Sequence, residues 1–143
     1  MLDQTDRKIV EELKKNARIS MKELGEKVHM TGQATTNRVL RLEEKEIIKG
    51  YTTLLDHNKL GYVVHAFITI FMHDFNHKSF LLFTEKQGQF IVHNFKISGD
   101  GCYLIEARFP SNEELDTFLN ELNQIANYKL SLVINDLTVK SSH

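Results

Sequence analysis

Cysteine is almost missing from this sequence, because Cys102 is the only one in the chain. A single cysteine excludes an internal disulfide framework and any metal site built from several thiolates. The residues beside it, Asp100, Gly101, Tyr103 and Leu104, supply no cation that would activate its thiol. We therefore expect Cys102 to be an ordinary strand residue, with a reactive thiol as the less favoured alternative.

Long apolar runs are missing as well. No stretch approaches the roughly 18 residues of a membrane-spanning helix, and the N-terminal MLDQTDRKIVEELKK contains no apolar signal core. Hydrophobic residues still make up 41% of the chain, which is enough to offset chain entropy and argues against disorder. These features predict a folded cytoplasmic protein with no membrane partner.

Motifs of catalysis are also lacking. The chain has no glycine-rich phosphate loop, no G-x-S-x-G nucleophile and no credible Cys–His pair. The run Gly99-Asp100-Gly101 precedes no predicted helix, so it is not a dinucleotide fingerprint. His73 and His77 are four residues apart, but they straddle a strand end and a loop, which is not the helical geometry of a good metal site. We expect no enzyme, no cofactor and no metal.

Positive charge is scarce for a protein that would bind nucleic acid, since the net charge is −1. The average hides an asymmetry between two parts of the chain. Residues 1–50 hold 11 Lys or Arg against 9 Asp or Glu, a net of +2, whereas residues 51–143 hold 7 against 10, a net of −3. So small a basic excess would bind DNA weakly in one copy, and useful affinity would need a dimer or a larger assembly.

Three helical patterns fill the first 46 residues. The first begins near Asp3, the second opens with the capping box from Ser20 to Glu23, and the third is capped by Thr31 and runs to about Lys45. The breaks between them are short, so the helices must pack closely at steep angles. The apolar positions that we expect to face inward are Ile9, Val10, Leu13, Ala17, Leu24, Val28, Ala34, Val39 and Leu42.

From Ile47 the pattern changes to extended chain, and we place a linker strand and hinge at about residues 51–61. Residues 1–50 then form one domain and residues 62–143 a second. The second domain alternates strands and helices in the order βαββαβ, the ferredoxin-like arrangement of an α+β fold. The expected elements are strands at Val63–Met72, Phe90–Ile97, Cys102–Phe109 and Leu130–Val139, with helices at Ser79–Lys86 and after Ser111.

The first of these strands has no polar face. In a ferredoxin-like domain both helices cover one face of the sheet, so the strands should alternate between apolar and polar residues. In Val63–Met72, however, Val63, Phe67 and Phe71 make the second face largely apolar too. An open apolar sheet face is an association surface, and the second domain is therefore predicted to self-associate face to face.

The third helix has the features of a DNA recognition helix. Its outward side chains can reach base edges and phosphates, while its apolar stripe faces inward. Arg38 falls near the edge of the buried stripe, so it either contacts DNA or makes an ion pair within the protein. On this helix alone, a solvated polar face explains the pattern equally well. The candidate DNA-binding residues are Thr31, Gln33, Thr36, Asn37, Arg38 and Arg41.

Three stretches of the chain resemble the Lrp/AsnC family, the feast/famine regulators of bacteria and archaea. They are LDQTDRKIVEELKKNARISMKELGEKV, NRVLRLEEKEIIKGYTTLLDHNKLG and SGDGCYLI, and they match the family pattern in type, spacing and order along the full length. The chain looks most similar to the short Bacillus-type members.

The resemblance implies a winged helix-turn-helix followed by a ferredoxin-like (RAM) domain of the kind named for regulation of amino-acid metabolism. It also implies sheet-to-sheet homodimers, commonly assembled into octamers, that bind double-stranded DNA. Small effectors, usually amino acids, would bind near the turn between the two central strands. A plain hairpin turn explains the same residues. Carried onto this chain, the effector-binding candidates are Gly99, Asp100, Gly101, Cys102 and Tyr103.

Three residues depart from the family pattern. Thr35 stands where a branched apolar residue is usual, which would loosen the packing of the third helix. Gly32 stands where Pro or Ser is frequent and lowers helix propensity. Glu46 replaces a glycine before the Ile-Ile pair, so the helix end lacks an easy left-handed residue. Thr35 and Gly32 could change the DNA target and the affinity for it, whereas none of the three residues is incompatible with the fold.

Together these observations predict a homo-oligomeric, sequence-selective DNA-binding transcription regulator that an amino acid or similar small effector modulates. One alternative is an architectural protein that bends or wraps DNA with little sequence preference. Another is the regulatory module of a metabolic enzyme, although no catalytic domain is attached.

Overall fold

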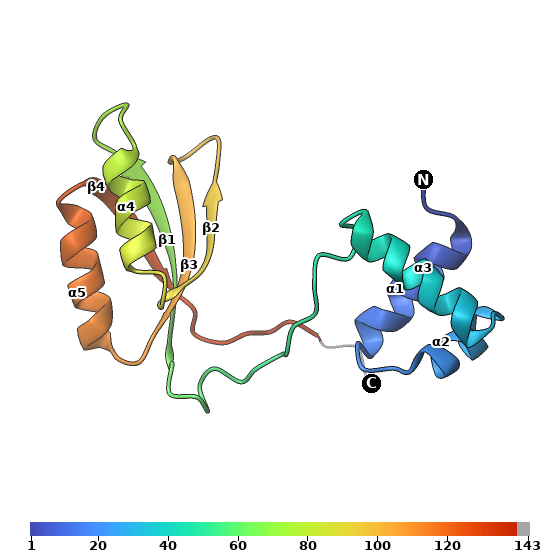
Figure 1. Ribbon diagram of the computed structural model, residues 1–143. Helices are drawn as coiled ribbons and strands as arrows, with labels where there is room; N and C mark the ends of the chain where they lie inside the picture. The colour runs from blue at the N-terminus through green and yellow to red at the C-terminus, as the bar shows by residue number, and fades with distance from the viewer. Residues whose placement is uncertain (140–143) are drawn as a thin grey trace. The chain divides into compact units, whose positions relative to one another are not determined.

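The protein folds into two compact units, seen in a computed structural model that describes residues 1–139 (Figure 1). One unit contains Met1–Leu54 and the other Leu55–Thr138. The boundary between them falls inside the linker predicted at residues 51–61. Between the last helix of the first unit and the first strand of the second, a stretch that is described throughout, the chain is extended and turned but carries no strand.

The first unit consists of three helices, α1 (Gln4–Lys15), α2 (Met21–Val28) and α3 (Gly32–Glu44). Each begins where a side chain accepts a backbone N–H that the helix itself leaves free. Asp3 accepts from Asp6, Ser20 from Glu23, and Thr31 from Ala34. The core that joins the helices consists of Ile9, Leu13, Ile19, Leu24, Val39 and Leu42.

A close approach between α2 and α3 depends on two small residues. A Cβ at Gly25 would lie 2.6 Å from the carbonyl oxygen of Met30 and 2.9 Å from Thr35 Oγ1. Thr35 is fully buried at this contact, and its hydroxyl donates to the carbonyl of Thr31 at 2.8 Å. The structure shows no loosening at Thr35, because its polar atom is satisfied within the helix.

The chain after α3 contains a residue in the left-handed conformation, and that residue is Glu46 and not a glycine. Glu46 has φ 57°, and this reversal lets the N–H groups of Ile47 and Ile48 both donate to the carbonyl of Leu42, at 3.0 and 3.1 Å. The expected difficulty at this helix end is therefore present as backbone strain at Glu46.

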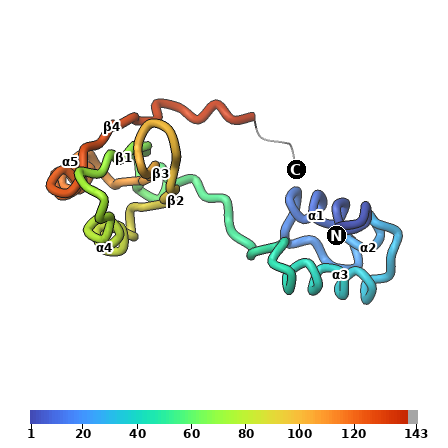
Figure 2. Tube along the Cα trace, turned by 90° about the horizontal axis from the view of Figure 1, so that it is seen from above, coloured from blue at the N-terminus to red at the C-terminus, as the bar shows by residue number. Residues whose placement is uncertain are grey.

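The second unit is a four-stranded antiparallel sheet with two helices, and its order along the chain confirms the predicted ferredoxin-like fold. The strand order is β2-β3-β1-β4. The helices α4 and α5 lie on the same face of the sheet (Figures 1 and 2). The elements are β1 (Val64–Met72), α4 (Lys78–Lys86), β2 (Ile91–Lys96), β3 (Tyr103–Phe109), α5 (Asn112–Asn123) and β4 (Ala126–Leu132).

The prediction of the last strand at Leu130–Val139 was wrong. β4 begins four residues earlier, at Ala126, and ends at Leu132. Its length is set by β1, since Ala126 pairs with Met72 and Leu132 with Ala66. Beyond Val133, whose N–H still donates to the carbonyl of His65, the chain has passed the end of its partner strand, so the apolar alternation there forms no ladder.

The helices cover only one face of the sheet. Ala66, Ile68 and Ile70 of β1 are fully buried and join residues of β3, α4 and α5 in one core. The opposite face carries Phe67 and Phe71, which are half-buried. Phe95 on β2 remains 49% exposed. The apolar residues predicted for the open face are therefore on it.

Candidate nucleic-acid interface

The outward face of α3 presents three exposed polar side chains, Gln33, Asn37 and Arg41. They lie one helical turn apart in sequence, so they share one face. The Gln33 side-chain amide donates to Asn37 Oδ1 at 3.3 Å, and this bond does not use the Asn37 amide hydrogens or the Gln33 carbonyl oxygen. A donor and an acceptor side by side match the N7 and N6 edge of adenine in the major groove.

Thr31 and Thr36 take less outward roles than Gln33 and Asn37. The Thr31 hydroxyl accepts from the Ala34 N–H at 3.1 Å and so caps the helix. The Thr36 hydroxyl donates to the carbonyl of Gly32 at 2.9 Å, and the side chain is half-buried. Of the predicted set, these two threonines have their oxygens engaged with backbone.

Arg38 is held within the first unit. Its Nη1 lies 2.5 Å from Asp3 Oδ2 and 3.1 Å from Asp6 Oδ1, and its side chain is 24% exposed. Hydrogen bonds to Asp3 and then Asp6 raise the pKa of Arg38. The backbone N–H of Asp6, followed by Arg38, lowers the pKa of Asp3. Of the two roles left open from the sequence, this geometry supports the ion pair, and it fastens α3 to the start of α1.

An exposed leucine on the same face was missed by the sequence reasoning. Leu40 is 49% exposed and lies three residues after Asn37, so it belongs to the outward face. The helical period places it there, although apolar residues are usually assigned to the inward stripe. A side chain of this kind can contact the methyl group of thymine.

Carboxylates gather at the other end of α3. Glu43 and Glu44 are in its last turn and Glu46 follows it. The Tyr51 hydroxyl donates to Glu43 Oε2 at 2.8 Å, and burial together with this bond raises the pKa of Tyr51 to about 12. The acidic end of the helix is thus separated along its axis from Gln33 and Asn37, as a DNA-contacting N-terminal half requires.

The turn between β2 and β3 contains the predicted effector residues. Gly99 and Gly101 have φ 103° and 96°, a conformation that side chains rarely adopt. A Cβ at Gly99 would meet nothing, whereas one at Gly101 would lie 2.6 Å from Thr69 Cγ2. Gly101 is therefore needed for close packing against β1, while Gly99 and Asp100 are exposed.

The two residues after this turn are less accessible. The Cys102 N–H donates to the carbonyl of Ile70 at 2.7 Å. Tyr103 is buried under α4, where its ring stacks on Phe80 at 4.3 Å and its hydroxyl lies 2.8 Å from His77 Nδ1. The structure therefore groups Gly99 and Asp100 at the surface and directs Tyr103 into the core.

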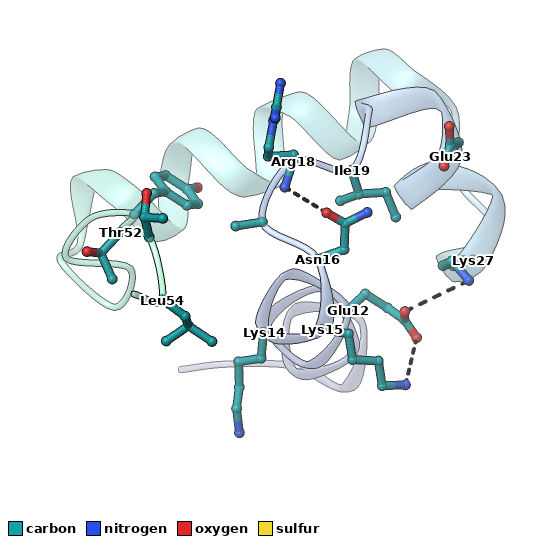
Figure 3. A pocket seen from close by; sticks show the side chains of 13 residues that line it. Glu12, Lys14, Lys15, Asn16, Arg18, Ile19, Glu23, Lys27, Thr52 and Leu54 are labelled. Carbon is teal, nitrogen blue, oxygen red and sulfur yellow. Dashed lines mark hydrogen bonds and ion pairs between the residues drawn. The ribbon is translucent and has the colours of Figure 1, made fainter. Parts of the chain in front are cut away.

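A cleft of about 830 Å³ lies in the first unit, between the end of α1 and residues 51–54. Figure 3 shows Glu12 at its edge, bridged to Lys15 and Lys27. Lys8 also contacts Glu12, at 3.1 Å, and hydrogen bonding from Lys8 lowers the pKa of Glu12. This carboxylate is 8% exposed and fully engaged with lysines, so its contacts are those of a structural ion-pair cluster.

A polar trio on the open sheet face was also missed by the sequence reasoning. His65 Nε2 lies 2.6 Å from Glu106 Oε2, and His93 Nδ1 lies 2.9 Å from Glu106 Oε1. The three residues come from three strands, so no spacing in the sequence could have grouped them without the strand register.

Neither a metal site nor a membrane span is found in the described part of the chain. Within residues 1–139, no three His, Cys, Asp or Glu side chains are grouped so that they could hold a metal ion. No helix in the same range is both long and apolar enough to cross a bilayer.

Comparison with known families and proteins agrees with this geometry. Residues 2–49 match the family described as winged helix-turn-helix DNA-binding, and residues 65–141 match the Lrp/AsnC ligand binding domain. The HTH-type transcriptional regulator LrpA of Bacillus subtilis is 52% identical over 134 residues, which cover 94% of this chain and 98% of that protein. LrpB of the same organism is 40% identical, covering 95% and 91%.

Solved structures share the fold over almost the whole chain. The structure of B. subtilis LrpC superposes with a TM-score of 0.91 at 31% identity, covering 98% of this chain and 99% of that one. A transcriptional regulator from Neisseria meningitidis in complex with L-Met superposes with a TM-score of 0.89 at 23% identity, covering 100% and 96%. With both of its domains matched by family models and regulator relatives covering most of its length, this chain belongs to the Lrp/AsnC family and is a DNA-binding transcription regulator.

Proposed function

We propose that the chain recognises its operator through Gln33, Asn37 and Arg41, as a homodimer or octamer whose assembly an amino acid modulates. DNA recognition is inferred from the different environments of the polar side chains on α3. Arg38 is engaged with Asp3 and Asp6, whereas Gln33, Asn37 and Arg41 are exposed on one face. Asn and Gln suit adenine, and Arg suits guanine or phosphate. Such a regulator works in the cytoplasm, where the DNA is.

The experiment uses a duplex selected from a random pool with the wild-type protein, and a shuffled duplex of the same composition. Asn37→Ala with Arg41→Ala should weaken binding to the selected duplex by at least about tenfold and bring it near that of the shuffled one. Lys14→Ala is the matched control, since it removes an exposed cation from α1. Unchanged selectivity in the double variant would contradict the assignment.

Self-association is proposed through the open face of the sheet. Phe67 and Phe71 lie on it without a covering helix, and Val63 at its edge is 57% exposed. Apolar side chains that no helix covers are stabilised by contact with a second copy. Two copies also double the modest basic excess of residues 1–50, which increases DNA affinity through simultaneous engagement of two half-sites.

Effector binding is proposed at the turn of Gly99 and Asp100. These two residues are exposed, and a carboxylate there can accept from the ammonium group of an amino acid while glycine leaves backbone N–H groups accessible to its carboxylate. Since a structural neighbour was solved with L-Met, L-methionine is the first candidate to test. An effector that binds one assembly better shifts the oligomer population and with it the spacing of the DNA-binding units.

Light scattering tests this proposal, with the full chain measured alone and with each of the twenty amino acids. A mass that changes with one amino acid, and no longer changes in Asp100→Asn, would support the turn as the site. If no amino acid alters either the mass or the DNA affinity, effector control through this domain is wrong.

A further inference from the structure

The open face of the sheet carries a cluster of titratable side chains beside its aromatic residues. It consists of His65 on β1, His93 on β2 and Glu106 on β3, which we call the histidine–glutamate trio. Each oxygen of the Glu106 carboxylate is engaged by one imidazole nitrogen, at 2.6 Å from His65 and 2.9 Å from His93. An ionised carboxylate only accepts hydrogen bonds, so both ring nitrogens donate.

An aromatic ring lies beside each histidine of the trio. The ring of His65 lies 5.4 Å from that of Phe67, and the ring of His93 stacks on Phe95 at 5.4 Å. In the single chain the trio is unevenly exposed, with side-chain values of 15% for His65, 20% for Glu106 and 58% for His93. Since Phe67 and Phe95 belong to the surface that a second copy would cover, the trio would lose its remaining water in the same step.

The charge balance of this face is set by few groups. Arg108 lies opposite His65 and Lys129 opposite Thr69 in the strand register, so both belong to the same face. Glu106 is the only carboxylate in the four strands. Burial favours a higher pKa for Glu106, but the hydrogen bonds from His93 and His65 outweigh it and lower that pKa. The carboxylate therefore stays ionised through the range in which histidine titrates.

We propose that the histidine–glutamate trio makes self-association through this face depend on pH, with assembly favoured above the titration range of histidine and weakened within it. The inference rests on the proposed self-association. One protonated ring is compensated by Glu106, but a second adds to Arg108 and Lys129 with no further anion on the strands. Two facing copies double this excess, and burying uncompensated charge is unfavourable.

The direction of this pH dependence follows from the linkage between proton binding and association. The covered face holds fewer protons than the open face, so association releases protons and its equilibrium constant rises with pH. Histidine is the side-chain type that changes charge between about pH 5 and 8, and the trio contains two of them. Among the histidines near this face, His65 and His93 belong to the trio, whereas His73 follows the opposite end of β1, where its Nε2 lies 3.1 Å from Asn127 Oδ1.

Sedimentation equilibrium of the full chain at constant ionic strength, from pH 5.5 to 7.5, tests the proposal. The wild-type association constant should fall by at least about tenfold toward pH 5.5. His65→Gln with His93→Gln keeps an N–H donor for Glu106 at each position but cannot be protonated, so its association constant should not change with pH. His57→Gln, which alters a histidine outside the sheet, should behave as the wild type.

Circular dichroism at each pH confirms that the proteins compared are folded. If the double variant does not fold, His93→Gln alone, at the more exposed ring, should remove part of the pH dependence. If the wild-type association constant does not change with pH, or if the double variant keeps the full pH dependence, the proposed role of the trio is wrong while self-association through this face still stands. A monomer at pH 7.5 would overturn the self-association on which it rests.

Discussion

At the scale of single residues, Glu46 occupies a conformation that glycine adopts more easily. Its φ of 57° reverses the chain after α3 so that Ile47 and Ile48 can both donate to Leu42. A side chain in this region places Cβ close to its own backbone, which costs about 1–2 kcal/mol.

Glu46→Gly should therefore raise the free energy of unfolding by about 1 kcal/mol. Glu46→Ala removes the same charge but keeps the Cβ, so it should leave stability nearly unchanged. Urea denaturation followed by circular dichroism measures both. Equal effects from the two variants would show that the charge, and not the backbone, controls this helix end.

The two glycines of the β2–β3 turn form a matched pair. Both have positive φ, but only Gly101 has atoms of β1 where a Cβ would stand, with Thr69 Cγ2 at 2.6 Å and the Ile70 carbonyl oxygen at 3.1 Å. Gly99→Ala should cost about 1 kcal/mol from backbone strain. Gly101→Ala should cost about 3 kcal/mol, because overpacking adds to that strain. Chemical denaturation of the two variants gives the difference, and similar losses would contradict the close approach to β1.

At the scale of an element, α3 combines two kinds of arginine. Arg38 is tied to Asp3 and Asp6, whereas Arg41 is exposed one turn beyond Asn37. The same residue type therefore serves the stability of the three-helix unit at one position and is available for DNA at the other.

Arg38→Gln should lower the melting temperature and leave the DNA affinity of the folded protein close to that of the wild type. Arg41→Gln should leave the melting temperature close to that of the wild type and reduce the affinity for a selected duplex by about tenfold. Thermal melting and fluorescence anisotropy of each variant separate the two roles. A loss of affinity in folded Arg38→Gln as large as that in Arg41→Gln would place Arg38 at the DNA as well.

At the scale of the whole molecule, carboxyl groups of both units have pKa values below their ordinary ones. In the first unit, the backbone of Asp6 and the side chain of Arg38 lower the pKa of Asp3, and Lys8 lowers that of Glu12. In the second unit, the Ser111 hydroxyl lowers the pKa of Glu114. A carboxyl group of this kind stabilises the fold above its unfolded pKa, and that contribution is lost as the pH falls through its folded value.

The contribution of these carboxyl groups to stability should therefore be constant near neutrality and should fall progressively below about pH 4.5, starting from the ordinary values of 4.5 for Glu and 3.8 for Asp. Urea midpoints measured between pH 7 and pH 3 test this. Glu114→Gln removes one of the responsible groups and should flatten part of the acid limb, whereas Glu113→Gln, at an exposed neighbour on the same turn, should flatten it less. A midpoint that rises toward pH 3 would contradict the sign.

Much of the fold followed from the sequence alone because its signals are local. Capping residues such as Asp3, Ser20 and Thr31 act within three or four residues, and strand alternation acts within one strand, so the three helices and the βαββαβ order could be predicted. The outward face of α3 followed from the helical period for the same reason.

Only the tertiary structure decided the rest, because it depends on partners far apart in the chain. The role of Arg38 depended on Asp3 and Asp6, which lie 35 and 32 residues away. The bounds of β4 depended on where β1 ends. The histidine–glutamate trio depended on strand register, which brings His65 to Glu106 across 41 residues. The sequence by itself determined the elements and the type of protein, whereas long-range pairing determined which of its charged side chains face the protein and which remain free to bind.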